Sequence, residues 1–274
     1  AIRPLKDGVI SNFEVTEMML SYFIHKVHGR SSFAKPRVVI AVPTGITEVE
    51  RRAVIDSAER AGARKVYLVD EPMAAGIGSG LPISEPTASM IVDIGGGTTE
   101  VAVLCLGDIV TSTSIRVAGD EMDEAIITYI RDMYGLEVGH RTAEEVKIAI
   151  GSAYPLQEEV SYEIRGKDIA AGLPRRLEIS SVEIREAISI PIQQIIDAAK
   201  SCLDRTPPEL ASDLLNTGIT LIGGGAMIPG VSELVAEETG LDVRVAEEPI
   251  MAVARGTAIL LERLDEYEEV LSED

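Results

Sequence analysis

Residues 90–103 combine a carboxylate, three glycines and two hydroxyls between two apolar segments. The carboxylate is Asp93, and it is followed by Ile94, Gly95, Gly96, Gly97, Thr98 and Thr99. Two strands joined by a tight hairpin are expected, because glycine tolerates positive φ and leaves the backbone open to close approach. Backbone N–H groups at such a tip can cradle phosphate oxygens, and Asp93 could hold Mg²⁺ through water. A plain glycine hairpin is the alternative, but the flanking carboxylate and hydroxyls favour phosphate binding.

The composition describes an acidic protein with an aliphatic core. Of 274 residues, 46% are hydrophobic but only 4% are aromatic, Trp is absent, and the net charge is −20. The length fits one large domain or two ordinary ones, and the negative charge argues against general nucleic-acid binding. Cys105 and Cys202 lie in apolar segments and are interpreted as buried thiols in a reducing compartment. Neither a signal peptide nor a membrane-spanning apolar run is apparent, so a cytoplasmic protein is expected.

Alternating strand and helix patterns predict a parallel α/β architecture. The first half is predicted to contain helices at 15–27, 47–62 and 71–78 and strands at 37–42 and 65–69. The second half is predicted to open with a strand meander at 89–94, 99–106 and 109–117. It continues with helices at 120–134, 142–150 and 182–203, short alternating segments at 160–164 and 177–179, strands at 219–222 and 243–246, and a last helix from 251. Capping boxes mark the helix starts at Thr47 and Thr142, and Pro191 is expected to kink its helix.

The two halves follow one plan. Without its opening meander, the second half has the order of elements predicted for the first, apart from an insertion near residues 139–205. A duplicated fold is therefore expected. It predicts a strand–turn–strand unit before Ala1 that would carry a partner to the Asp93 hairpin.

Several motifs in order then resemble a known family. Residues 69–75, 93–100, 118–123 and 222–225 resemble segments of the actin-like ATPases, and more closely of the MreB family of bacterial actin homologues. The resemblance covers residues 2 to about 264. It implies a duplicated ribonuclease-H-like α/β fold whose first half lacks its opening β-meander. Residues 1–85 would be the remainder of domain I and 86–248 domain II, with residues 249–274 as a C-terminal helix and acidic tail packing towards domain I.

The resemblance also implies a role for individual residues. Asp93 would face Mg²⁺ through water, and Gly95, Gly96, Gly97 and Thr98 would surround the phosphates of ATP. Glu71, which would orient the attacking water, and Thr98 would be the catalytic residues. The nucleoside would be held by Glu144, Glu145, Val146 and Lys147, and by Gly224, Gly225, Ala226 and Met227. Alternatives stay open: Glu71 could simply begin a helix, Glu144 and Lys147 could be a solvated helix face, and residues 223–225 could be an ordinary turn.

A cell-shape-determining, ATP-dependent filament subunit is the function that the resemblance implies. Such a protein would lie at the inner face of the cytoplasmic membrane, guide cell-wall elongation, and assemble with itself and with membrane proteins such as RodZ, MreC and MreD. One departure is that residues 1–8 do not resemble the first phosphate loop, Gly-x-Asp-x-Gly-Thr, of full-length members. Weak ATP binding and slow hydrolysis are therefore expected. A sugar or acetate kinase and a chaperone ATPase of the same superfamily are the alternatives, but the small segment 160–180 suits a filament contact better.

A basic loop gives a local hint of a membrane contact. Lys26, Arg30, Lys35 and Arg37 occur without an intervening acid, and Phe33 lies among them. Basic residues beside an exposed aromatic suit an anionic lipid surface. The alternative is a solvated loop whose Phe33 folds back into the core.

Overall fold

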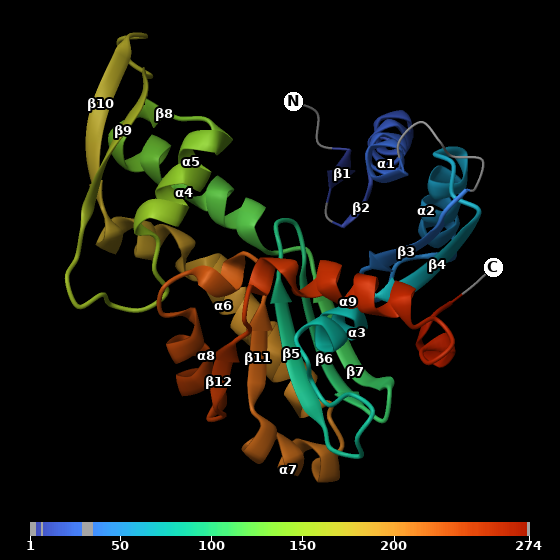
Figure 1. The fold of residues 1–274 in the computed structure, drawn as a ribbon. Helices are drawn as coiled ribbons and strands as arrows, with labels where there is room; N and C mark the ends of the chain where they lie inside the picture. Colours follow the sequence, from blue (N-terminus) through green and yellow to red (C-terminus); the bar gives the residue numbers. More distant parts are fainter. Residues whose placement is uncertain (1–3, 7, 29–34, 273–274) are drawn as a thin grey trace.

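The computed structural model describes residues 4–6, 8–28 and 35–272 (Figure 1). The predicted membrane loop around Phe33 lies outside the described residues. None of the helices within these ranges is both long and apolar enough to cross a membrane.

A five-stranded sheet forms the centre of the molecule. The strands β5 (Ser89–Ile94), β6 (Thr99–Cys105) and β7 (Asp108–Ile115) form an antiparallel meander, which confirms the meander predicted from the sequence. On the other side of β5 lie β11 (Ile219–Ile222) and β12 (Val243–Val245), both parallel to their neighbours. Every residue of β5 and β6 is buried, so both faces of this sheet must be covered.

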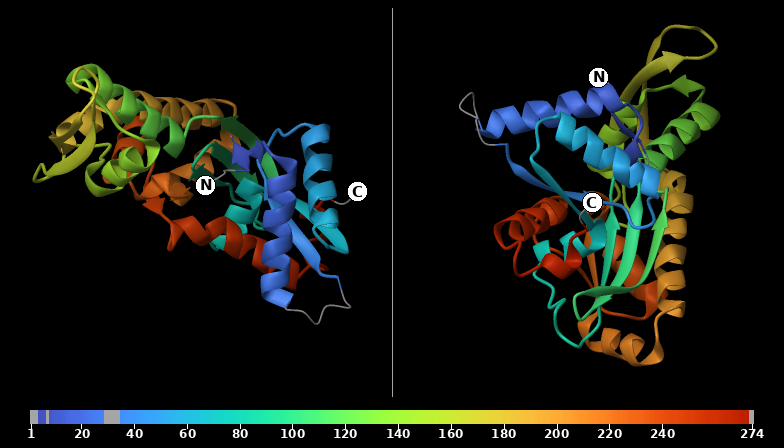
Figure 2. Two further views of the ribbon diagram at one scale, coloured as in Figure 1. Left: turned by 90° about the horizontal axis from the view of Figure 1, so that it is seen from above. Right: turned by 90° about the vertical axis from the view of Figure 1, so that its right-hand side faces the viewer.

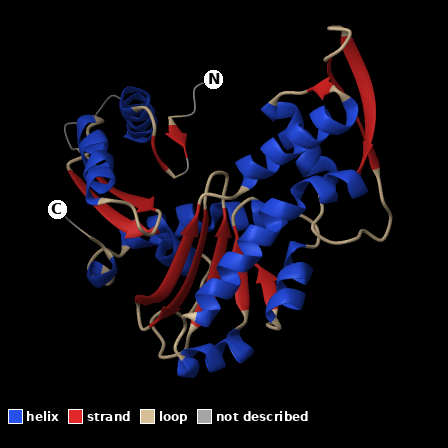
Figure 3. Ribbon diagram, turned by 180° about the vertical axis from the view of Figure 1, so that it is seen from behind, coloured by secondary structure: helices blue, strands red, loops and turns tan. Residues whose placement is uncertain are grey.

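Helices cover both faces of the central sheet (Figures 1 and 3). Met90, Val92 and Val103 point to one side and join a core with α4 (Gly119–Tyr134) and α6 (Ser181–Asp204). Ile91 and Leu104 point to the other side and join a core with α3 (Glu71–Gly78) and α9 (Ala252–Glu262). This alternation is the two-residue period of a strand that is buried on both faces.

The first half stands beside this sheet as a smaller layer. Its strands β3 (Arg37–Val42) and β4 (Lys65–Asp70) are parallel, and α1 (Phe13–His28) and α2 (Glu48–Arg60) stack next to them (Figure 2). A short hairpin of β1 (Leu5–Lys6) and β2 (Val9–Ile10) precedes α1. The outer edge of β4 is bridged by Ser272 near the C-terminus, whereas within the described residues β4 is the only strand that pairs with β3.

Two glycines bring α3 and α9 into close contact. A Cβ atom at Gly78 would lie 1.9 Å from the carbonyl oxygen of Ala252, and one at Gly256 would lie 1.8 Å from that of Ala74. Only glycine fits at such a crossing, because any side chain would overlap the backbone of the other helix. The C-terminal helix is thereby fixed against the helix that begins with Glu71.

A separate antiparallel sheet projects from the other end of the molecule (Figure 1). It consists of β8 (Leu136–Glu137), β9 (Ser161–Asp168) and β10 (Pro174–Ser180), and α5 (His140–Ile150) lies next to it. The long helix α6 leaves this region and packs with its C-terminal part against β6 and β7.

The structure corrects several predicted boundaries. The capping box at Thr47 is confirmed, but the one at Thr142 is wrong: α5 begins at His140, after Gly139, without a side-chain cap. The sequence pattern also missed the β1–β2 hairpin, α7 (Pro208–Thr217) and three short 3₁₀ turns, η1 (Gly225–Met227), η2 (Pro249–Met251) and η3 (Glu268–Val270). The helix α8 (Val231–Thr239) lies between β11 and β12. The two-residue strands and the 3₁₀ turns are too short for a periodic signal, whereas α7 begins at Pro208 and ends before Gly218, which are boundary signals that the periodic pattern does not use.

Candidate functional site

A cavity of about 620 Å³ lies where the ends of β5 and β11 meet the beginning of α4. Its polar side is formed by Asp93, Gly95 and Gly96, the start of α4, and Glu144 and Lys147 from α5. Its apolar side is formed by Ile148, Met227, Ile228, Pro229, Pro249, Ile250 and Val253. A cavity of this size, with one polar and one apolar wall, suits a ligand that has both a charged and an aromatic part.

The glycine hairpin is held in place through its backbone. The Gly95 N–H donates to the Thr98 carbonyl at 3.0 Å, which closes the tip of the hairpin. The first amides of α4 then donate to the hairpin: Gly119 to the Gly95 oxygen at 3.2 Å and Asp120 to the Gly96 oxygen at 2.7 Å. Helix N-terminal amides otherwise lack partners, so these bonds satisfy α4 and fix the hairpin together.

Lys147 lies at the centre of a buried polar group. Its Nζ is 2.8 Å from Oδ1 of Asp123 and donates to the Gly119 carbonyl, also at 2.8 Å. The side chain of Asp123 is only 3% exposed and that of Lys147 12%. Burial raises the pKa of Asp123, and the hydrogen bond and charge of Lys147 oppose that rise. The pair therefore places an ammonium group at the wall of the cavity.

The turn after β11 packs closely on the end of β5. Gly223 has φ of +81°, and a Cβ atom there would lie 2.4 Å from the Ile94 carbonyl oxygen and 2.5 Å from Oδ1 of Asp93. At Gly224, by contrast, a Cβ atom would meet nothing within 4 Å. Gly223 therefore allows the turn to approach the carboxylate, and Gly224 leaves open space in the cavity.

Four carboxylates gather behind the hairpin. Burial and then the charge of Glu100 raise the pKa of Asp93 to about 7. Burial and then the charges of Asp93, Glu100 and Asp70 raise the pKa of Glu71 to about 8. These carboxylates resist ionisation together, so the site favours an incoming positive charge. Among the described residues no three His, Cys, Asp or Glu side chains are arranged to hold a metal ion. A single carboxylate with water and phosphate ligands is nevertheless the usual environment of Mg²⁺, and Asp93 fits it.

Most of the predicted nucleotide residues meet at the cavity. Its lining includes Asp93, Gly95, Gly96, Glu144, Lys147, Gly224, Gly225 and Met227. The side chain of Glu145 pairs instead with Arg141 at 2.9 Å, and Val146 and Ala226 are in the core. Thr98 lines a second cavity of about 400 Å³, beyond the hairpin. Neither Gly97 nor Glu71 is part of the first lining, although Glu71 lies close enough to Asp93 to be influenced by its charge.

Sequence reasoning missed several residues of the site. Gly119 and Asp123 were seen only as part of a motif, and no role was assigned to them. The feature that could have pointed to them is Lys147, because a buried ammonium group requires a polar partner. Pro249 and Ile250 had no signal beyond being apolar.

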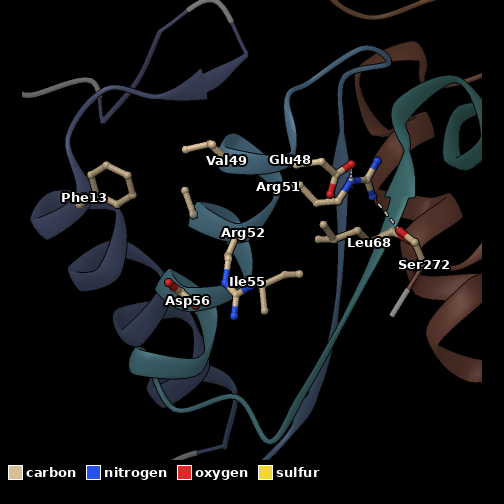
Figure 4. A pocket seen from close by; sticks show the side chains of 10 residues that line it. Phe13, Glu48, Val49, Arg51, Arg52, Ile55, Asp56, Leu68 and Ser272 are labelled. Carbon is tan, nitrogen blue, oxygen red and sulfur yellow. Dashed lines mark hydrogen bonds and ion pairs between the residues drawn. The ribbon is translucent and has the colours of Figure 1, made fainter. Parts of the chain in front are cut away.

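A third cavity, of about 540 Å³, lies in the first half between α1, α2 and β4 (Figure 4). Arg51 reaches across it and donates to Oγ of Ser272 at 2.7 Å. Phe13, Val49 and Leu68 supply its apolar wall. It contains none of the predicted site residues and no glycine backbone that could bind phosphate, so we do not assign it to the same ligand.

The chain is similar to known proteins along nearly its whole length. A protein-family model described as MreB/Mbl protein matches residues 1–269. The cell shape-determining protein MreB of Escherichia coli (strain K12) is 53% identical over 266 residues, which are 97% of this chain and 77% of that protein.

Two solved structures from one organism are similar throughout. The crystal structure of MreB5 of Spiroplasma citri bound to ADP superposes with a TM-score of 0.92 at 38% identity, covering 98% of this chain and 80% of that one. The structure of the same protein bound to AMPPNP superposes with a TM-score of 0.91, at the same identity and coverage.

Proposed function

The chain belongs to the MreB/Mbl family of cell-shape-determining, actin-like proteins, and from that premise we propose that it is an ATP-dependent filament subunit. The observation that carries the proposal is the cavity in which hairpin backbone, Lys147 and Asp93 face one apolar wall. A nucleoside triphosphate has the matching chemistry.

We infer the orientation of the nucleotide from the two walls. The phosphates would lie against Gly95 and Gly96, whose backbone carries no side chain, with the ammonium group of Lys147 at the same wall. The base would lie against Ile148, Met227 and Ile250, which are 74%, 59% and 63% exposed and have no other cover among the described residues. The related MreB5 of Spiroplasma citri was solved with ADP and with AMPPNP, which supports this choice of ligand.

The proposed chemistry is hydrolysis of the terminal phosphoryl group. Asp93 would hold Mg²⁺ through water, and that ion would supply charge neutralisation when bound. Glu71 would orient the attacking water through a hydrogen bond. Because its pKa is raised to about 8, only the ionised fraction of Glu71 could act as a base at neutral pH. Among the described residues a glycine hairpin faces the cavity from the second half alone, so slow hydrolysis is expected.

Nucleotide binding is the decisive test. Titration of the purified chain with a fluorescent ATP analogue should show saturable binding that unlabelled ATP and ADP displace. Lys147→Ala should weaken it about tenfold, because a hydrogen bond from a charged group is lost. Lys167→Ala is the matched control, since that lysine is on β9, outside the cavity lining, and pairs with Glu137 at 3.9 Å. If ATP fails to bind, or if both variants bind alike, the site is assigned wrongly.

The proposed function includes filament assembly and a location at the membrane. We propose that the chain forms homopolymers at the inner face of the cytoplasmic membrane and works there with RodZ, MreC and MreD. The basic loop around Phe33 would supply the lipid contact. Co-sedimentation of filaments with anionic liposomes should fall for Phe33→Ala and, at low salt, for neutralised Lys35 and Arg37. Unchanged pelleting of both variants would place the membrane contact elsewhere.

A further inference from the structure

Glu100 is a buried carboxylate that the proposed reaction does not use. It is on β6, directly opposite Asp93 in the register, and it is 1% exposed. Its Oε2 accepts hydrogen bonds from the N–H and Oγ1 of Thr44, at 3.2 and 2.5 Å, and its Oε1 accepts one from Oγ of Ser114 at 2.5 Å. Burial raises its pKa, and the bonds from Ser114 and Thr44 oppose that rise.

These bonds join the two halves of the molecule. Thr44 follows β3 in the first half, whereas Ser114 is on β7 of the central sheet. A carboxylate beside Asp93 and Glu71 is electrostatically unfavourable, since it raises the pKa of both. A buried charge in such a place is costly unless its hydrogen bonds are well formed. The hydrogen bonds of Glu100 therefore indicate that it holds in place the segment that follows β3, which we call the Thr44 loop.

The Thr44 loop lies near the glycine hairpin. Thr98 and Thr44 line the same cavity of about 400 Å³. A Cβ atom at Gly8 would lie 2.7 Å from Cγ of Pro43 and 3.2 Å from Cγ2 of Thr98, so the segments around Gly8, Pro43 and Thr98 come close together at this point. We therefore expect a displacement of the Thr44 loop to reach Thr98 through Gly8.

The hairpin thus has two supports. The amides of Gly119 and Asp120 fix its tip to the second half. On its other side Thr98 lies close to Gly8, which is also close to Pro43 of the first half, and Glu100 holds Thr44, the residue after Pro43. The phosphates of a nucleoside diphosphate and of a triphosphate would both reach the tip, so the first support affects both ligands. Only the longer phosphate chain of a triphosphate would extend towards Thr98, so the second support affects that ligand alone.

We propose that Glu100 is a positioning residue that fixes Thr98 through Thr44 and thereby makes the site prefer a nucleoside triphosphate over a diphosphate. This inference rests on the proposed nucleotide function. It assigns Glu100 no contact with the nucleotide, so its effect must appear as a difference between two ligands rather than as general loss of binding.

The test compares Glu100→Gln and Thr44→Val with the control Ser112→Ala. Ser112 lines the same cavity, but its register partner is Ala102 rather than Glu100. Competition with a fluorescent nucleotide gives the affinities for AMPPNP and ADP. We expect both test variants to bind AMPPNP about tenfold more weakly and ADP within about twofold of the unaltered chain, from the loss of a hydrogen bond to a charged group. Equal weakening of AMPPNP and ADP, or an effect of the control, would overturn the proposal.

Amide hydrogen exchange without nucleotide supplies an independent readout. The Thr44 and Gly95 amides should both exchange about tenfold faster in Glu100→Gln, because each loses part of its support. Faster exchange at Thr44 alone would mean that Glu100 holds the loop but not the hairpin, which contradicts the inference. If the unaltered chain binds neither AMPPNP nor ADP, the proposed function fails, and the exchange at Gly95 still decides whether Glu100 positions the hairpin.

Discussion

Folding raises the pKa values of Glu71 and Asp93 into the neutral range. The pKa of Glu71 rises from 4.5 to about 8 on folding, chiefly through burial. The folded chain then binds this proton more tightly than the unfolded chain, so the stability that Glu71 contributes is greatest below pH 4.5. It is lost as the pH rises towards 8.

Replacing Glu71 by Gln should therefore stabilise the nucleotide-free protein. Glu71→Gln removes the titrating proton, so we expect a higher melting temperature at pH 8 and a flatter dependence of melting temperature on pH between 4.5 and 8. In a hydrolysing protein the same variant should lower kcat more than ATP affinity, since the carboxylate acts on the transition state. Glu178→Gln, on the exposed face of β10, is the control. A steeper pH dependence in Glu71→Gln would show that Glu71 is ionised in the folded chain.

The pair of Lys147 and Asp123 allows a second prediction. Lys147→Ala leaves the carboxylate of Asp123 buried without its partner, which costs about 3–5 kcal/mol in the free energy of unfolding. Adding Asp123→Asn should restore much of that loss, because the buried charge is then gone. Urea unfolding of the two single variants and the double variant measures both effects. Strictly additive losses would mean that the two side chains are not coupled.

Among the elements, the turn after β11 offers two neighbouring glycines with different tasks. Gly223→Ala should lower the free energy of unfolding by several kcal/mol, since its φ is +81° and its new Cβ would overlap the Ile94 carbonyl. Gly224 has φ of −67° and open space around it, so Gly224→Ala should leave the stability within about 0.5 kcal/mol.

For nucleotide affinity we expect the opposite order: Gly224→Ala should weaken nucleotide binding although it leaves the stability unchanged. Gly224 lines the cavity, so a methyl group there would enter the space of the ligand although the fold tolerates it. Chemical denaturation and nucleotide titration together make the comparison. A stable Gly223→Ala variant would refute the close approach described for this turn.

Elements with a strong local pattern could be predicted from the sequence, and those fixed by distant contacts could not. Ser89–Ile94 and Glu71–Gly78 were predicted with their observed ends, because a continuous apolar run and a Pro near the helix start are local signals. The start of α5 was misplaced by two residues, since the Gly139 carbonyl accepts hydrogen bonds from the amides of Thr142 and Ala143 and the helix begins without a side-chain cap. The pairing of Asp123 with Lys147, and of Glu100 with Thr44, joins residues 24 and 56 positions apart, and no periodicity reveals such contacts.

For the molecule as a whole, the net charge of −20 opposes self-assembly. Subunits of like charge repel, and salt screens that repulsion over a Debye length of about 10 Å at 0.1 M and about 3 Å at 1 M. We expect the critical concentration for polymerisation to fall severalfold when KCl is raised from about 50 to about 300 mM, as measured by light scattering and pelleting. A rise would mean that opposite charges dominate the contact between subunits.

The free edge of β3 also has a consequence for handling the protein. Its counterpart β11 pairs on both sides, whereas among the described residues only β4 pairs with β3. Such an edge presents backbone groups on which a foreign strand can add, whereas the side chains of Val38, Val39 and Ile40 pack against the hydrophobic cores. Pro36 and Pro43 bracket it and act as gatekeepers, since neither can donate a ladder hydrogen bond. When the protein is concentrated, we therefore expect small aggregates whose growth is limited by these prolines, rather than extended amyloid-like fibres.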